Sequence, residues 1–346
     1  MQLTDREREI LATIIEAYIA SAAPVASRTV AKRSRLDLSP ASMRTVMADL
    51  TEKGLLEQPH TSAGRVPTSE AFRVYIDTML PRPEPSREVR ERIERVLSEA
   101  GLEIKDILRQ AGRILSDQSH QVSMILAPRY GSVRWKQIEF VLVRTGLVLV
   151  VLVLEGGMIQ QKLIAMEEKV TADDLSKYAN YLNELFINRT VAEVRAHILR
   201  ELRGARERLS DLCGRALSLV EEAFDADGPQ ELYVDGTAYI LRQPDFADLR
   251  SMREMFDVLD DRSKLLDILD RVMESNCLCV TLGKDTSLQS GTDMGLISSP
   301  YAIQGRSLGV ISVMGPLRMD YAKVVPMVDY MARILTDILQ KRLEQP

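Results

Sequence analysis

Helix-starting and helix-ending residues divide the first 80 residues into short segments, and this division constrains the fold more than any other feature of the sequence. Within each segment, apolar residues recur every three or four positions, which predicts one buried helix face. Ser39 and Pro40 are residue types preferred at the N-cap and at the first helical position, and Gly54 is typical of a helix end. The predicted helices span residues 4–21, 27–34, 39–53 and about 68–79.

Two short extended segments separate the third helix from the fourth. Residues 55–58 and 65–66 are expected to be strands, joined by a loop of small and polar residues at 59–64. Three helices, a two-stranded wing and a further helix are typical of a winged helix-turn-helix unit, in which the helix after the turn enters the DNA major groove. We therefore predict a winged-helix DNA-binding domain at residues 1–80.

The third helix is the predicted reading element. Its apolar residues share one face, which leaves the polar residues near its N-terminus facing outward. Arg44 can donate two hydrogen bonds to a guanine, and hydroxyl side chains can contact a base edge or a phosphate. The predicted DNA-binding residues of this helix are Ser39, Ser42, Arg44 and Thr45.

Basic and hydroxyl residues outside the third helix are predicted to contact the DNA backbone. Residues 28–35 contain four basic residues and no acid, although such a cluster can also be an ordinary solvated helix face. Arg65, at the exit of the wing, could reach a minor groove. Residues 1–80 hold ten basic and ten acidic side chains, so we expect a moderate dependence of binding on salt. The predicted residues are Arg28, Lys32, Arg33, His60, Thr61, Ser62 and Arg65.

The remaining chain is predicted to be an α+β domain with an insertion. A proline-rich linker at 81–86 follows the first domain. Strands are expected within 121–164 and 277–314, and helices at about 86–119, 172–186, 191–224, 247–258, 263–274 and 322–343. This order predicts one domain formed by residues 87–165 and 240–346, interrupted by a mainly helical insertion at 166–239.

An uninterrupted apolar run lies within the first group of strands. Residues 147–154 are all Leu or Val, with no charge and no proline. We expect a central strand buried on both faces, although such a segment favours aggregation whenever it is exposed.

Several segments of the chain resemble the HrcA family of heat-inducible transcription repressors. The most specific is the wing, Pro-His-Thr-Ser-Ala-Gly-Arg-Val-Pro-Thr at 59–68; others lie at 24–29, 39–44, 236–246, 309–311 and 315–321. The sequence departs from the family pattern at Ala26, where glycine is usual, and at Thr45, where asparagine is usual.

The resemblance implies a function and an architecture. It implies a repressor of chaperone operons that binds the CIRCE inverted repeat in double-stranded DNA as a homodimer. It also implies that the chaperonin GroEL promotes its activity. The implied architecture is a winged helix, a GAF-like domain and a helical dimerisation domain inserted into the GAF-like domain.

Other classes of function have less support in the sequence. We find no catalytic constellation, no set of side chains with metal-ligand spacing and no cofactor motif, so we expect neither an enzyme nor a bound cofactor. The N-terminus does not resemble a signal peptide and no apolar run is long enough to span a membrane, so a cytoplasmic protein is expected. Two alternatives stay open: a winged-helix regulator controlled by a small ligand in the GAF-like domain, and a protein-binding adapter.

Overall fold

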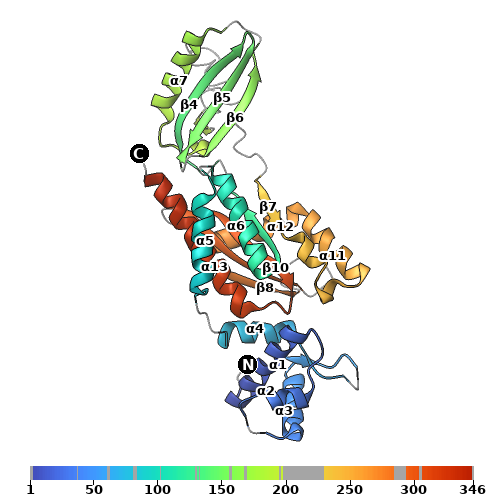
Figure 1. The fold of residues 1–346 in the computed structure, drawn as a ribbon. Coiled ribbons are helices and arrows are strands. Elements are labelled where there is room, and N and C mark those ends of the chain that lie inside the picture. The colour runs from blue at the N-terminus through green and yellow to red at the C-terminus, as the bar shows by residue number, and fades with distance from the viewer. Residues whose placement is uncertain are drawn as a thin grey trace.

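The computed structural model describes residues 3–36, 38–60, 63–80, 84–101, 103–128, 131, 133–155, 158–166, 170–194, 196–197, 230–283, 294–303 and 306–344. The chain folds into three units arranged in a row along an elongated molecule (Figure 1). A small helical unit lies at one end, a five-stranded sheet with helices lies in the middle, and a three-stranded sheet lies at the other end. Among the helices that could be assessed, none is both long and apolar enough to cross a membrane.

The N-terminal unit has the predicted order of helices and strands. Three of its four helices begin at a residue whose side chain accepts a backbone N–H: Thr4, Ser39 and Thr68 accept from Glu7, Ser42 and Ala71. The short antiparallel strands form the base of the wing. The elements are α1 (Asp5–Ser21), α2 (Ser27–Arg33), α3 (Pro40–Glu52), β1 (Leu56–Glu57), β2 (Val66–Pro67) and α4 (Ser69–Thr78).

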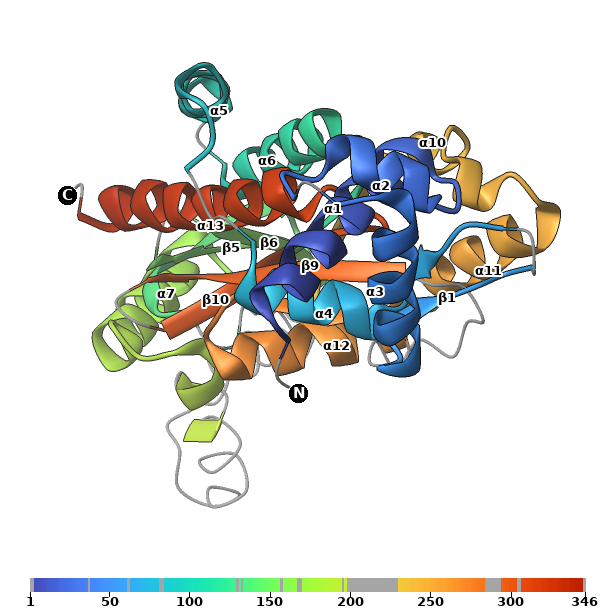
Figure 2. The same cartoon turned by 90° about the horizontal axis from the view of Figure 1, so that it is seen from below.

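The middle unit is an antiparallel sheet in the order β7-β3-β10-β9-β8. Figure 2 shows α6 and α13 on one face of this sheet and α12 on the other. Successive residues of β3 enter different apolar clusters: Ile125 joins the cluster that includes α6 and α13, whereas Met124 and Leu126 join α11 and α12. The strands are β3 (Val122–Leu126), β7 (Leu232–Asp235), β8 (Cys279–Leu282), β9 (Met294–Ile303) and β10 (Arg306–Pro316).

Helices cover both faces of the middle sheet. The stretch that we predicted as helical over residues 86–119 is divided near Gly101, which has a φ of +88°. A left-handed backbone cannot continue a right-handed helix, so two helices form and pack against each other. The helical elements are α5 (Arg87–Glu99), α6 (Ile104–Ser119), α10 (Thr237–Ile240), η3 (Pro244–Phe246), α11 (Leu249–Asp260), α12 (Arg262–Ser275) and α13 (Tyr321–Glu344).

The third unit is a meander of β4 (Trp135–Arg144), β5 (Leu147–Leu154) and β6 (Ile159–Ala165), with α7 (Ala172–Phe186) packed against β4. Asn183 of α7 fastens the two elements together. Its Oδ1 accepts hydrogen bonds from Trp135 Nε1 at 3.2 Å and from the Ile138 amide at 2.7 Å, and its Nδ2 donates to the Ile138 carbonyl at 3.0 Å.

The structure differs from the prediction in how the strands are grouped into sheets and in how deeply β5 is buried. Strands β4, β5 and β6 pair with one another and with no strand of the middle sheet among the described residues, whereas we expected them in one domain with the strands at 277–314. Strand β5 is central, as expected, but only alternate residues are buried, because α7 covers one face and nothing in the described chain fully covers the other. The predicted burial on both faces is therefore wrong. Most of the expected helix at 191–224 lies outside the described residues.

Candidate nucleic-acid interface

Helix α3 is held in the N-terminal unit by one apolar face. Met43, Val46, Met47 and Leu50 are buried, and the helix packs against α1 and α2. At its first turn, Ser39 Oγ accepts the Ser42 amide at 3.2 Å and lies 3.1 Å from the Ser42 hydroxyl. Ser39 therefore caps the helix, and a direct contact with a base would have to share this hydroxyl.

The outward face of α3 carries Arg44 and Thr45, both exposed. Thr45 Oγ1 donates a long 3.4 Å hydrogen bond to the Ala41 carbonyl. Arg44 makes no ion pair or hydrogen bond through its guanidinium with any described residue. Figure 1 places α3 at the end of the molecule farthest from the three-stranded sheet. The Arg44 guanidinium is thus accessible and has no partner within the described chain.

Helix α2 places a second set of cations beside α3. Arg28, Lys32 and Arg33 are exposed, and among the described residues none forms an ion pair. The end of α2 is fixed on α1 because Glu9 Oε1 accepts the Ser34 hydroxyl at 3.2 Å and the Arg35 amide at 2.9 Å. The predicted basic residues of α2 therefore face solvent on a helix whose position is fixed.

The wing is tied to the segment before α2. Val25 and Arg65 exchange two backbone hydrogen bonds of 2.8 and 2.9 Å. A Cβ on Gly64 would lie 2.5 Å from the Val25 carbonyl carbon and oxygen, so only glycine allows this approach. His60 is exposed near the wing tip, whereas Thr61 and Ser62 lie outside the described residues.

Arg65 lies at the base of the wing rather than at its tip. The side chain is half-buried, and its buried Nε has no hydrogen-bond partner in the described part of the chain. A buried donor of this kind is costly unless a further partner satisfies it. The position is compatible with a contact to DNA along the wing, which stays a prediction.

An ion pair that the sequence analysis missed connects α1 to the end of α3. The buried Glu7 carboxylate accepts Lys53 Nζ at 2.6 Å and the Thr4 amide at 2.9 Å. The hydrogen bond from Lys53, followed by that from the Thr4 amide, lowers the pKa of Glu7 below its usual value. The Thr4–Glu7 spacing is a capping-box signal, but the sequence does not indicate Lys53 as a partner.

Comparison with known proteins places these features in a family. Residues 2–79 match the family described as winged helix-turn-helix transcription repressor, HrcA DNA-binding, and residues 105–325 match HrcA protein C terminal domain. The chain belongs to the HrcA family. One relative is the heat-inducible transcription repressor HrcA of Nitratidesulfovibrio vulgaris (strain DSM 19637 / Miyazaki F), 46% identical, with 98% of this chain and 97% of the relative covered. Another, of the same name, from Geobacter sulfurreducens, is 41% identical, with 98% of both chains covered.

One solved structure shares the fold of this HrcA chain. A hypothetical protein with a crystal structure at 2.2 Å resolution has the same overall fold, with a TM-score of 0.64 at 20% identity, covering 99% of this chain and all of that one. HrcA proteins are transcription repressors, so the family supports the regulatory interpretation rather than an enzyme.

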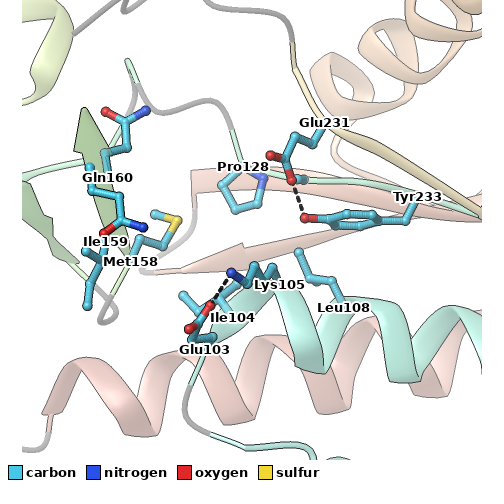
Figure 3. Close-up of a pocket in the computed structure, with 12 residues that line it drawn as sticks. Glu103, Ile104, Lys105, Leu108, Pro128, Met158, Ile159, Gln160, Glu231 and Tyr233 are labelled. Atoms are coloured by element: carbon cyan, nitrogen blue, oxygen red, sulfur yellow. Dashed lines mark hydrogen bonds and ion pairs between the residues drawn. The ribbon is translucent and has the colours of Figure 1, made fainter. Parts of the chain in front are cut away.

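One cavity of this HrcA chain is large enough to be considered as a site for a small ligand. It has a volume of about 430 Å³ and lies between the start of α6, the β6 segment and β7 (Figure 3). Four of its polar side chains pair with each other: Lys105 Nζ lies 2.5 Å from Glu103, and the Tyr233 hydroxyl donates to Glu231. Gln160 also lines the cavity, and its buried Oε1 has no hydrogen-bond partner among the described residues.

Proposed function

We propose that this chain is a heat-inducible repressor of chaperone operons that binds the CIRCE inverted repeat through α3. The observation that carries the proposal is the outward face of α3, where Arg44 and Thr45 are exposed on a capped helix beside the basic face of α2. An unpaired arginine near the start of a recognition helix suits bidentate contact with guanine in the major groove. The names of the relatives and the family description of residues 2–79 support the same function.

We further propose that the repressor is a dimer formed through the open face of the β4-β5-β6 sheet. An inverted repeat requires two recognition helices related by a two-fold axis. Val141, Leu149 and Leu163 lie side by side across the three strands, and Val141 and Leu163 are 47% and 57% exposed. An apolar face of this kind is typical of an interaction surface, and a second copy of the chain would cover it.

The dimerisation unit then includes these strands. We propose that it begins near residue 133 and ends near residue 230, inserted between β3 and β7 of a GAF-like domain. The pairing of β3 with β7 supports this boundary, because the chain leaves the middle sheet after β3 and returns to it at β7.

The same open face provides a reason for dependence on GroEL. In a monomer, the apolar β5 strand and its neighbours would be exposed to solvent and prone to aggregate. We propose that GroEL increases the fraction of chains that reach the dimeric, DNA-binding form. If operator binding survives heating and recovery to the same extent with and without GroEL, this part of the proposal is wrong.

The direct experiment is a titration of the purified protein against a fluorescent CIRCE duplex and a scrambled duplex at one salt concentration. Selective binding to CIRCE by at least about 10³-fold is expected, the lower end of the usual preference for a specific site. Equal weak binding to both duplexes would contradict the proposal. It would favour the adapter, which has the helices but does not read DNA.

Control by a small ligand is the alternative function. The cavity of Figure 3 is the observation closest to it, and the mutual pairing of its charged groups weakens the case. A metabolite that changed operator affinity without affecting dimerisation would support this alternative.

A further inference from the structure

Two segments singled out by their resemblance to the family, 236–246 and 315–321, meet at the side chain of Arg318. Its Nε donates to Asp245 Oδ1 at 2.9 Å, and its Nη2 donates to Asp245 Oδ2 at 2.6 Å, which makes the ion pair bidentate. Nη2 also lies 3.2 Å from Gln243 Oε1. The Arg318 and Asp245 side chains are only 12% and 23% exposed, so solvent screens this pair less than an ordinary surface ion pair.

The third nitrogen of the Arg318 guanidinium, Nη1, forms a hydrogen bond to the N-terminal unit rather than to the middle unit. Nη1 donates to the carbonyl oxygen of Ile19 at 3.2 Å, in the last turn of α1. Carbonyl groups at a helix end have no partner within the helix, and the helix dipole favours a cation there. Helix α1 has no basic residue in its last turn. Arg318, from the middle unit, therefore supplies the cation that the end of α1 lacks.

An apolar contact lies beside this ion pair. The Phe72 ring of α4 lies between two tyrosine rings, with centroid distances of 6.5 Å to Tyr18 and 5.8 Å to Tyr321. Tyr321 follows Arg318 by three residues and is fully buried. The apolar contact keeps the two units together, but apolar attraction has little directional preference. The fork of the Arg318 guanidinium is directional, so it restricts the angle between the units.

We propose that Arg318 is a positioning residue that fixes the orientation of the winged helix on the middle unit, with Asp245 holding its guanidinium in place. Orientation matters because a dimer reads both arms of an inverted repeat only when its two recognition helices have the correct spacing and direction. This consequence for DNA binding rests on the proposed function. The orienting contact itself does not.

The first test measures orientation without DNA. Spin labels are attached at Glu52 of α3 and Asp267 of α12, in a background in which the native cysteines are serine, and the distance distribution between them is recorded by pulsed electron resonance. Arg318→Gln and Asp245→Asn should broaden the distribution. Arg250→Gln, which removes an exposed ion pair with Glu254 inside α11, should not. Unchanged distributions in Arg318→Gln and Asp245→Asn, with native circular dichroism, would overturn the proposal.

The second test measures affinity for the complete inverted repeat and for a duplex that contains a single arm. Arg318→Gln should weaken binding to the complete repeat by about tenfold to a hundredfold, the factor for a lost hydrogen bond to a charged group. Binding to the single arm should not change, and Arg318→Lys should recover part of the loss. Equal losses on both duplexes would contradict a positioning role. If the wild-type protein shows no preference for the repeat, the proposed function fails, and the distance measurement still decides the role of Arg318.

Discussion

Arg44 combines exposure, a fixed helical position and the absence of any described ionic partner. Arg44→Ala should weaken operator binding by about 1–3 kcal/mol, the usual contribution of a bidentate arginine–guanine pair. Binding to a scrambled duplex should change little. The measurement is a titration with both duplexes, with Arg6→Ala as the control, because Arg6 is an exposed arginine on α1 of the same unit. A parallel loss on both duplexes would mean that Arg44 contacts only phosphates.

The stability of the N-terminal unit should depend on pH through the Glu7 carboxylate. Its pKa is lowered in the folded state, so its contribution to stability is complete above the ordinary value of 4.5 and is lost as the pH falls through the lower folded value. Glu7→Gln should lower the free energy of opening of α1 by about 1.5–3 kcal/mol at pH 7, the range for hydrogen bonds to a charged group.

Hydrogen exchange of the α1 amides in the full chain measures this effect. The difference between wild type and Glu7→Gln should shrink as the pH falls below 4.5. Glu16→Gln, an exposed acid on the same helix, should exchange like the wild type. A difference that stays constant down to pH 2 would contradict the assignment of the effect to the Glu7 carboxylate.

At the scale of elements, the wing depends on a close backbone approach that only glycine permits. Gly64→Ala would place a Cβ 2.5 Å from the Val25 carbonyl, so the pairing of Val25 with Arg65 should break. We expect operator affinity to fall at least about tenfold and the wing amides to lose protection from exchange, since overpacking of this kind costs about 1–3 kcal/mol. Gly112→Ala is the control, because its Cβ would meet nothing nearer than 3.5 Å. Unchanged affinity in Gly64→Ala would show that the wing does not contribute to binding.

Elements with local signals were predictable from the sequence. The caps Thr4, Ser39 and Thr68 determine helix starts within a few residues of chain, and the predicted starts agree with the structure. The strand segments were also found, and the two strands of the wing pair as predicted, but the division of the later strands into two sheets was not predicted. The alternation of apolar and polar residues along a strand indicates which residues are buried, but it does not indicate which strand lies beside it. The separate β4-β5-β6 sheet could therefore not be predicted.

In the candidate site too, contacts with a local signal in the sequence were predictable and long-range contacts were not. The outward position of Arg44 follows from the apolar face of its own helix, which the sequence displays. The contacts of Glu7 with Lys53, and of Arg318 with Ile19, join residues 46 and 299 positions apart. Long-range contacts of this kind depend on how units pack, and a single sequence has no local signal for them.

At the scale of the whole molecule, the open face of the three-stranded sheet should control assembly. Leu163→Asp would place a charge in the proposed interface, where desolvation is costly, and should convert the proposed dimer to a monomer in sedimentation equilibrium. Ile187→Asp is the control, because Ile187 is 54% exposed but follows α7 and lies outside the open face. A Leu163→Asp protein that remains dimeric would move the interface elsewhere.

In the proposed function, two copies of α3 read the two arms of one inverted repeat together. The most direct measurement compares the affinity for the CIRCE repeat with that for the same repeat lengthened between its arms by about 5 base pairs, half a helical turn. The extra half-turn moves the arms to opposite faces of the duplex, so the lengthened repeat should bind no more tightly than a duplex with a single arm. Equal affinity for the original and lengthened repeats would contradict the simultaneous reading of both arms by two copies of α3.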